Sequence, residues 1–122
     1  MLVQPLLASV SQLGEWPLVF FDGHYSHAAN KRVTLPESGT VEALFAEESN
    51  VPGTADSEQI AVAQAAIDVV TKRFGAPTYA RVDLVHDDDG HSCVLELELI
   101  EPSLFLPQAG PEAVNRLVAA FT

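Results

Sequence analysis

Residues 79–102 read YARVDLVHDDDGHSCVLELELIEP, and this stretch decides the fold of the chain. Two runs in which apolar and charged or polar side chains alternate flank a cluster of turn-forming residues. The alternating apolar positions are Ala80, Val82 and Leu84 in the first run and Leu95, Leu97 and Leu99 in the second. A period of two is the pattern of a strand with one buried face. The stretch therefore predicts a β-hairpin with an apolar face and a charged face.

The turn of this hairpin predicts its register. Asp89-Gly90 is a dipeptide that suits a two-residue type I′ turn, because both central residues of that turn need positive φ. Counting back from the turn pairs the two runs, and the predicted pairs are Leu84 with Leu95, Asp83 with Glu96, Val82 with Leu97, and Arg81 with Glu98. Like charges directly opposite each other destabilise a sheet. Removing the carboxylate of Asp83 or Glu96 is therefore expected to leave stability unchanged or to raise it.

The charged face of the predicted hairpin carries Arg81 and three carboxylates, those of Asp83, Glu96 and Glu98. Antiparallel hairpins commonly turn one polar face to water, so a solvated outer face is one interpretation. The other is a metal site, because Mg²⁺ binds through one or two carboxylates, keeps waters and completes its shell with substrate phosphates. The pattern of residues leaves both interpretations open.

Two segments resemble a known family. Residues 81–83 (RVD), residues 96–98 (ELE) and Pro102 resemble the C-terminal core of ATP-grasp ligases, where an R-[IV]-D strand precedes an E-x-N strand and a proline. Residues 18–32, LVFFDGHYSHAANKR, are similar to the FxDGxxSHAxxK segment of the glutathione-synthetase-like, or RimK-like, branch. The likeness covers nearly the whole chain but only about the second half of the family's fold. We therefore expect a fragment of a longer protein or a shortened relative, without the front half and the preceding domain.

The resemblance implies a fold and a reaction. The fold would be a single α+β domain over residues 1–122, an antiparallel sheet with helices packed on one face. The reaction would be that of an ATP-dependent carboxylate–amine ligase, in which ATP phosphorylates a small-molecule carboxylate and an amine displaces phosphate from the acyl phosphate. By resemblance, Asp83, Glu96 and Glu98 would hold Mg²⁺, with Mn²⁺ as the alternative, and Arg81 would contact the transferred phosphoryl group.

The resemblance also suggests further contacts and shows departures. Gln4 lies in the segment that would offer backbone hydrogen bonds to adenine, and Lys31 or Arg32 would face phosphate or a substrate carboxylate. Glu98 stands where most of the family has Asn. The lysines that bind ATP phosphates and the G-D-F-R-V-Q segment of related proteins are absent from the sequence, which puts binding of the acceptor in doubt.

Two alternative functions remain open, and these departures favour the first of them. The first is a non-catalytic, truncated relative that acts as an interaction module or as half of a split site, which a partner or a second copy would complete. The second is an acidic domain that binds no ligand. Whether the chain is a fragment of a longer enzyme or a truncated relative, we expect the isolated chain to be inactive.

Composition excludes several classes of partner. The chain has 122 residues, 17 acidic against six Lys and Arg, and a formal net charge of −11, which argues against binding to nucleic acid or to an anionic membrane. A single cysteine, Cys93, forbids an intrachain disulfide and fits a reducing compartment, so we expect a cytoplasmic location. The sequence contains neither a signal-peptide pattern nor a run of ~20 apolar residues that would span a bilayer.

The remaining elements follow from periodicity and breakers. Strands are predicted over 17–22 and 25–33, a short strand over 1–4, a strand or helical turn over 41–45, and segment 104–106 is expected under the sheet. His24 and His27 would point to opposite faces of their strand, so zinc binding by this pair is not expected.

Two helices are predicted. The first covers 58–74, with Asp56 or Ser57 as N-cap and Gln59 in a capping-box position. The second covers 111–121 and begins at a proline. The side chains expected to face inward are Ile60, Ala63, Ile67, Val70 and Phe74 in the first helix, and Val114, Leu117, Val118 and Phe121 in the second.

Overall fold

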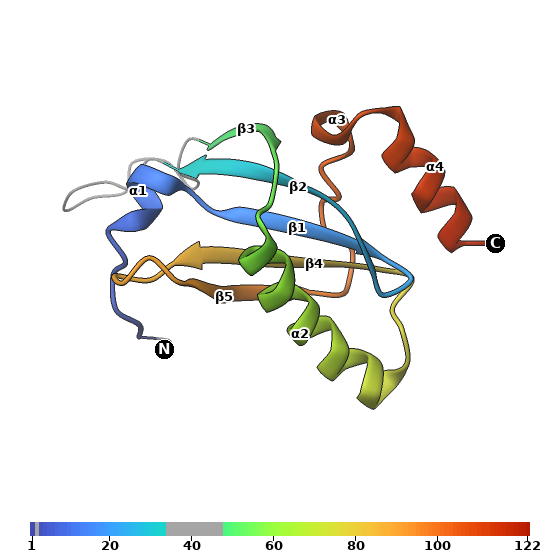
Figure 1. Ribbon diagram of the computed structural model, residues 1–122, viewed down its shortest axis with the longest axis horizontal. Coiled ribbons are helices and arrows are strands. Elements are labelled where there is room, and N and C mark those ends of the chain that lie inside the picture. Colours follow the sequence, from blue (N-terminus) through green and yellow to red (C-terminus); the bar gives the residue numbers. More distant parts are fainter. Residues whose placement is uncertain (2, 34–47) are drawn as a thin grey trace.

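The fold is a five-stranded antiparallel sheet with helices, seen in a computed structural model that describes residues 1, 3–33 and 48–122. The strand order is β3-β2-β1-β4-β5 (Figure 1). The strands are β1 (Trp16–Phe21), β2 (His24–Val33), β3 (Glu48–Gly53), β4 (Tyr79–His86) and β5 (Ser92–Glu98). The predicted α+β fold class is confirmed, and so are the β4–β5 hairpin and the two strands predicted over 17–22 and 25–33, which pair as β1 and β2.

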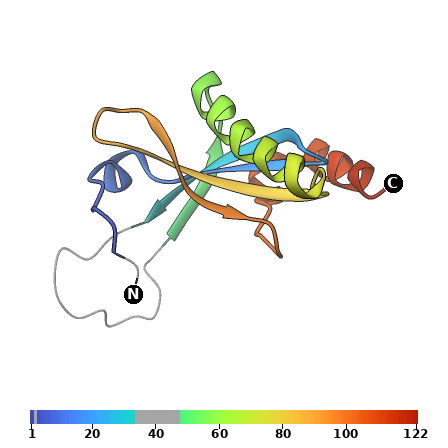
Figure 2. The ribbon, with the colours of Figure 1, turned by 90° about the horizontal axis from the view of Figure 1, so that it is seen from below.

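Four helices accompany the sheet in the described residues: α1 (Ser9–Leu13), α2 (Ser57–Phe74), α3 (Leu106–Ala109) and α4 (Pro111–Ala120). The long helix α2 crosses one face of the sheet (Figure 1), and the segment that follows β5 passes along the opposite face before it reaches α3 and α4 (Figure 2). The prediction that segment 104–106 packs under the sheet fits this path, because Phe105 is buried.

The main hydrophobic core lies between α2 and the sheet. Its largest fully buried side chains include Leu18, Phe20, Val82 and Leu84 from the central strands and Ile67 from α2. The central strand β1 is buried on both faces, since Val19 and Phe21 on its other face are also covered. A strand buried on both sides reads as a continuous apolar run, and residues 16–21 (WPLVFF) have that composition.

The register of the β4–β5 hairpin agrees with the prediction at three of four pairs. Arg81 pairs with Glu98, Val82 with Leu97 and Asp83 with Glu96, but Leu84 pairs with Val94. The predicted Leu84–Leu95 pair is wrong because the turn contains three residues, Asp88 to Gly90, instead of two.

The turn and a bulge compensate each other in this hairpin. The amide of Asp87 donates to the carbonyl of His91 at 2.8 Å, and Gly90 has φ +83°, the geometry of a three-residue loop that ends in a left-handed residue. The extra loop residue shifts the pairing by one, and an irregularity after Asp83 shifts it back. The charged residues therefore regain the predicted partners.

The predicted helix over 58–74 is confirmed with its cap. Asp56 is the N-cap, its Oδ1 accepts from the Gln59 amide at 2.8 Å, and the Gln59 side chain accepts from the Asp56 amide at 2.9 Å. Ala63, Ile67 and Val70 are buried as predicted. Phe74 was predicted to face inward, but it is 76% exposed. It is the last residue of α2 and lies beyond the edge of the core.

The inward face predicted for the last helix is mostly wrong. Ala113 is the buried residue of α4, whereas Val114, Val118 and Phe121 are 44%, 57% and 66% exposed. The periodicity predicted a helix here, but α4 contacts the sheet mainly at β1 and β2, and much of its apolar surface is not covered by the described residues.

Several local predictions differ from the structure. Strand β3 and helix α1 were not predicted, and residues 1, 3 and 4 form no strand. Pro52 argued against a strand, yet β3 is an edge strand, where a missing amide donor is tolerated. The segment 41–45 lies outside the described residues.

Candidate functional site

The candidate site lies on the sheet face opposite α2, along one row of side chains. His27 on β2 pairs with Val19 on β1, Val19 pairs with Arg81 on β4, and Arg81 pairs with Glu98 on β5. Residues that pair across strands point to the same face, so these four side chains form a row over four strands. Asp83 and Glu96 form the next pair on this face.

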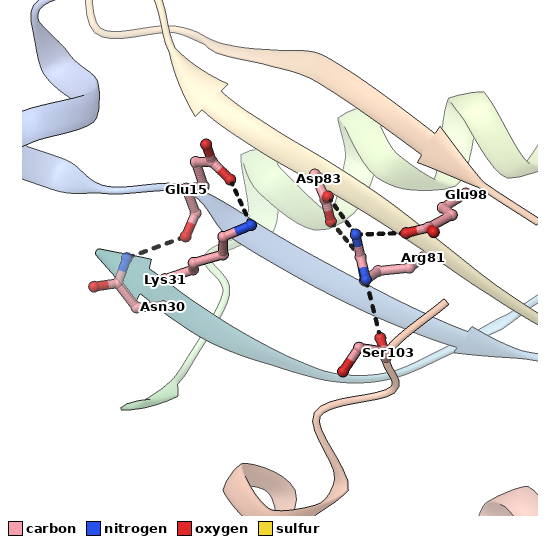
Figure 3. A network of polar contacts seen from close by, with 7 residues as sticks. All are labelled: Glu15, Asn30, Lys31, Arg81, Asp83, Glu98 and Ser103. Atoms are coloured by element: carbon pink, nitrogen blue, oxygen red, sulfur yellow. Dashed lines mark hydrogen bonds and ion pairs between the residues drawn. The ribbon is translucent and has the colours of Figure 1, made fainter. Parts of the chain in front are cut away.

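Arg81 is the centre of this row and is 8% exposed. Its Nε and Nη2 donate to the two carboxylate oxygens of Asp83 at 2.7 and 2.9 Å, and Nη2 lies 2.6 Å from Oε2 of Glu98 (Figure 3). Its Nη1 donates to the Ser103 carbonyl at 3.3 Å, and its guanidinium carbon lies 5.6 Å from the centre of the Phe105 ring. Arg81 is therefore held in one orientation by contacts from three segments.

The electrostatics of Arg81 favour its charged form. Burial lowers the pKa of the Arg81 guanidinium, but the hydrogen bond and charge of Asp83, together with the charges of Glu98 and Glu96, outweigh burial and raise that pKa above its ordinary value. The like-charge repulsion expected between Asp83 and Glu96 is consequently offset by the guanidinium beside them. This arrangement corrects the premise that removing Asp83 would be harmless to stability.

The three predicted metal ligands share a face, but Arg81 holds two of them. Asp83 is 3% exposed with both oxygens bonded to Arg81, Glu98 is half-buried and bonded to the same guanidinium, and Glu96 is exposed. Among the described residues, no group of three His, Cys, Asp or Glu side chains is placed to hold a metal ion. Carboxylate oxygens are the donors that Mg²⁺ prefers, so the chemistry fits, while a cation would have to compete with the Arg81 guanidinium for them.

A cavity of about 390 Å³ lies at the turn end of the same face. It is lined by Gln4, Pro5, Leu6, Leu7, Val10, Glu15, Val85, Cys93, Val94 and Leu95. Its volume lies within the ~300–1,000 Å³ typical of small-molecule sites, which are mostly apolar with a few polar groups. Gln4, predicted to lie near a nucleotide base, is one of the lining residues.

Sequence reasoning missed most of the residues that line this cavity. Val85 and Cys93 pair across the hairpin and occupy the charged face, two positions beyond Asp83 on β4. The apolar Val85–Cys93 pair follows charged pairs on the same face of the hairpin, and this change from charged to apolar could have predicted the cavity. Burial, followed by the charge of Asp87, raises the pKa of the Cys93 thiol, which favours the thiol over the thiolate.

The two predicted basic residues separate in the structure. Lys31 Nζ lies 3.4 Å from Oε2 of Glu15, which lines the cavity, and these side chains share the face of Arg81 (Figure 3). Arg32 is the next residue of the strand and points the other way, where it donates to Oδ1 of Asn30 at 2.8 Å and to the carbonyl of Gln12. The structure therefore brings Lys31 to the candidate site and not Arg32.

Most of this chain is similar to part of a larger protein. No family model matches the sequence. The cycloserine biosynthesis protein DcsG of Streptomyces lavendulae is 43% identical over 108 residues, which are 86% of this chain and 36% of DcsG. The crystal structure of D-cycloserine synthetase DcsG matches with a TM-score of 0.83 at 40% identity, over 97% of this chain and 40% of that one.

More distant structures share the fold. D-alanine–D-alanine ligase of Bacillus anthracis, whose structure is also known in complex with ATP, matches with a TM-score of 0.56 at 18% identity over 87% of this chain and 39% of the ligase. The ATP-grasp ligase PsnB matches with a TM-score of 0.53 at 20% identity over 87% of this chain and 34% of PsnB. In the described part of the chain, no helix has the length and apolar character needed to cross a bilayer. The chain is therefore a relative of DcsG that shares part of the fold of the ATP-grasp ligase PsnB, and it spans about two fifths of the length of the relatives it matches.

Proposed function

We propose that this chain is the ATP- and Mg²⁺-binding part of an ATP-dependent carboxylate–amine ligase that works through an acyl phosphate. The observation that carries the proposal is the placement of an apolar cavity and a charged row on one face of the sheet. The cavity is lined by Val85 and Cys93, which directly continue the strands that hold Asp83 and Glu96. A flat apolar base and a charged phosphate tail need these two surfaces side by side.

The proposed roles follow the positions of the side chains. The base would occupy the cavity beside Gln4 and Leu6, and Lys31 would face the phosphates from the neighbouring strand. Arg81 would contact the transferred phosphoryl group, because a buried, oriented guanidinium stabilises charge that develops there.

Three carboxylates would hold the metal. Asp83, Glu96 and Glu98 lie on one face and supply oxygen donors. Mg²⁺, or Mn²⁺ in its place, would when bound neutralise phosphate charge. In the structure as described, Arg81 neutralises Asp83 and Glu98 instead, so we propose that the metal joins together with the nucleotide phosphates and not before them.

The substrate class is proposed from the relatives. Names such as D-cycloserine synthetase and D-alanine–D-alanine ligase make a small, amino-acid-derived carboxylate and an amine the first substrates to test. The surfaces that bind them would come in part from other regions of a longer protein, a partner chain or a second copy. A reducing, cytoplasmic setting is proposed from the single cysteine.

A second candidate is a non-catalytic relative that acts as an interaction module or as half of a split site. The observation that favours it is the engagement of both Asp83 and Glu98 by Arg81, with no ready group of three metal ligands among the described residues. On this alternative the Arg81 ion pairs are a structural feature, and the chain binds nucleotide only after another chain completes the site.

Titration of the 122-residue chain with ATP and MgCl₂, followed by calorimetry and by amide NMR shifts, tests the proposal. We expect saturable heat and shifts clustered at the residues that line the cavity. The variant Cys93→Phe, which would fill the cavity with a ring, should abolish binding, while Cys93→Ser should keep it. Absence of saturable binding in the folded wild-type chain would contradict a self-sufficient nucleotide site and leave the split-site candidate.

A further inference from the structure

A chain of polar contacts connects His27 to the segment that supports Arg81. His27 is 8% exposed and lies in the same row as Arg81, separated from it by Val19. Its Nε2 lies 2.7 Å from the Leu104 carbonyl oxygen. The residues on either side of Leu104 both contact Arg81, Ser103 through its carbonyl and Phe105 through its ring. Segment 103–105 therefore contacts two members of the row, His27 and Arg81.

The partners of the His27 ring determine its protonation. The Leu104 carbonyl can only accept, so Nε2 must carry a proton. The other ring nitrogen, Nδ1, lies 2.7 Å from Ser26 Oγ, and that oxygen accepts from Arg116 Nε at 2.9 Å. A neutral ring with Nε2–H lets the Ser26 hydroxyl donate to Nδ1, so every donor in the chain finds an acceptor.

The charges around His27 support the neutral form. Burial lowers the pKa of the His27 imidazole, the bond to the Leu104 carbonyl raises it, and the charge of Arg116 lowers it, with a net displacement below the ordinary value. Arg116 faces the ring from α4, and Arg81, neutralised by Asp83 and Glu98, lies beyond Val19 on β4. The Phe21 ring packs 5.9 Å from the imidazole on β1, and Tyr25 is the titratable neighbour on β2.

The segment held by His27 is strained where it meets Arg81. Phe105 adopts φ +50°, a left-handed conformation that is unfavourable for a residue with a side chain. It is 8% exposed, and its ring lies under the Arg81 guanidinium. A strained residue keeps such a conformation only where surrounding contacts hold it, and the bond from His27 to the preceding carbonyl is one of those contacts.

We propose that His27 is a positioning residue that, through the Leu104 carbonyl, holds segment 103–105 beneath Arg81 and so orients the Arg81 guanidinium. His27 bonds the Leu104 carbonyl, and the two residues next to Leu104, Ser103 and Phe105, contact Arg81. His27 itself does not touch the guanidinium. The orientation of the Arg81 guanidinium can be tested without reference to function. Its role in phosphoryl transfer rests on the proposed function.

The test compares three variants of the full chain without nucleotide or metal. His27→Ala removes the bond, and His27→Gln keeps an N–H donor at a similar reach. His24→Ala is the matched control, since His24 is an exposed histidine of the same strand. The readout is the solvent exchange of the Arg81 Nε–H proton by NMR, which the bond to Asp83 protects.

We expect His27→Ala to speed the exchange of the Arg81 Nε–H proton about tenfold, because one supporting hydrogen bond is lost. His27→Gln should restore most of the protection. His24→Ala should leave the exchange rate unchanged. Unchanged exchange in a folded His27→Ala chain, or no rescue by glutamine, would overturn the proposal. If His27→Ala does not fold, the nitrogen NMR shifts of the wild-type imidazole decide instead. A ring protonated only at Nδ1 at pH 7 would also overturn it, because Nε2 would then have no proton to donate to the Leu104 carbonyl.

These readouts separate the two proposals of function and positioning. Normal protection of Arg81 together with no binding of ATP and Mg²⁺ would count against the proposed function alone. Binding of ATP with Arg81 exchange that does not depend on His27 would count against the positioning role alone.

Discussion

The Arg81–Asp83 pair shows how one buried side chain changes the meaning of its neighbours. Both partners are less than 10% exposed, and both carboxylate oxygens of Asp83 are bonded to the guanidinium. Removing the Asp83 charge would leave Glu98 as the carboxylate still paired with the buried Arg81 guanidinium, which would lose its other partner. The carboxylates of Asp83 and Glu96, which are equivalent in the sequence pattern, therefore differ in what they do for stability.

The substitutions Asp83→Asn and Glu96→Gln test this difference. We expect Asp83→Asn to lower the free energy of unfolding by about 1–3 kcal/mol, because Arg81 loses its bidentate carboxylate and keeps only Glu98 as an ion-pair partner. Glu96→Gln should change it by less than about 0.5 kcal/mol, because Glu96 is exposed. Urea unfolding of both variants measures the values. Equal effects would show that the Arg81–Asp83 contact does not form in solution.

The thiol of Cys93 reports on the cavity. Burial and the charge of Asp87 raise its pKa, so a smaller fraction is thiolate at any given pH. We expect iodoacetamide to modify Cys93 more slowly than a short cysteine peptide, with the midpoint of the rate displaced to higher pH. Adding ATP with MgCl₂ should slow the reaction further if the cavity holds the base. A rate equal to that of the peptide would mean that the cavity is open to water.

His27 should make stability depend on pH in a known direction. Its pKa in the folded chain is lowered from the ordinary value of 6.5, so the unfolded chain binds the proton more tightly. The contribution is present above pH 6.5 and is lost as the pH falls through the lower pKa of the folded state. Between pH 7.5 and pH 5, the wild-type chain should therefore lose more unfolding free energy than His27→Gln. Equal losses in urea titrations would contradict this sign.

Helix α2 depends on its first turn as well as on its buried face. Asp56 and Gln59 form a reciprocal capping box that satisfies two amide donors at the helix start. Asp56→Ala should cost about 1 kcal/mol of unfolding free energy. Asp88→Ala, at an exposed turn position, is the matched removal of an aspartate outside any helix cap. A similar cost for both variants in chemical unfolding would show that the cap contributes little.

The β4–β5 hairpin is built from two deviations that cancel. The three-residue turn and the irregularity after Asp83 each shift the pairing by one, in opposite directions. A one-residue slip reverses the faces of a strand. Without the second deviation, the side chains of Glu96 and Glu98 would point toward α2 and that of Leu97 toward the charged row. The register in which β5 contacts α2 is therefore also the register that assembles the site.

The net charge of −11 should make the fold sensitive to salt. Repulsion among carboxylates destabilises a compact state, and salt screens it. We expect the unfolding temperature to rise by a few degrees between low and physiological ionic strength. NaCl and MgCl₂ at equal ionic strength should act alike without nucleotide, because Arg81 occupies Asp83 and Glu98. A larger effect of MgCl₂ alone would mean that Mg²⁺ binds the chain before ATP.

The predictable parts of this protein are those governed by neighbours in sequence. Strand alternation, the capping box at Asp56 and the pairing of Arg81 with Glu98 followed from spacing, because each depends on residues in one hairpin or one helical turn. The exposure of Phe74 and Phe121 did not follow. Periodicity shows that a helix has an apolar stripe, but the extent of the partner surface decides which residues of the stripe become buried.

The local pattern of side chains was enough to indicate an antiparallel α+β fold and the shared face of Asp83, Glu96 and Glu98. The amino-acid order did not reveal that Arg81 neutralises two of these carboxylates, that Lys31 and not Arg32 joins them, or that His27 reaches Leu104 across 77 positions of chain. Contacts between distant segments form only when the sheet brings them together, and their geometry depends on packing that no short spacing encodes.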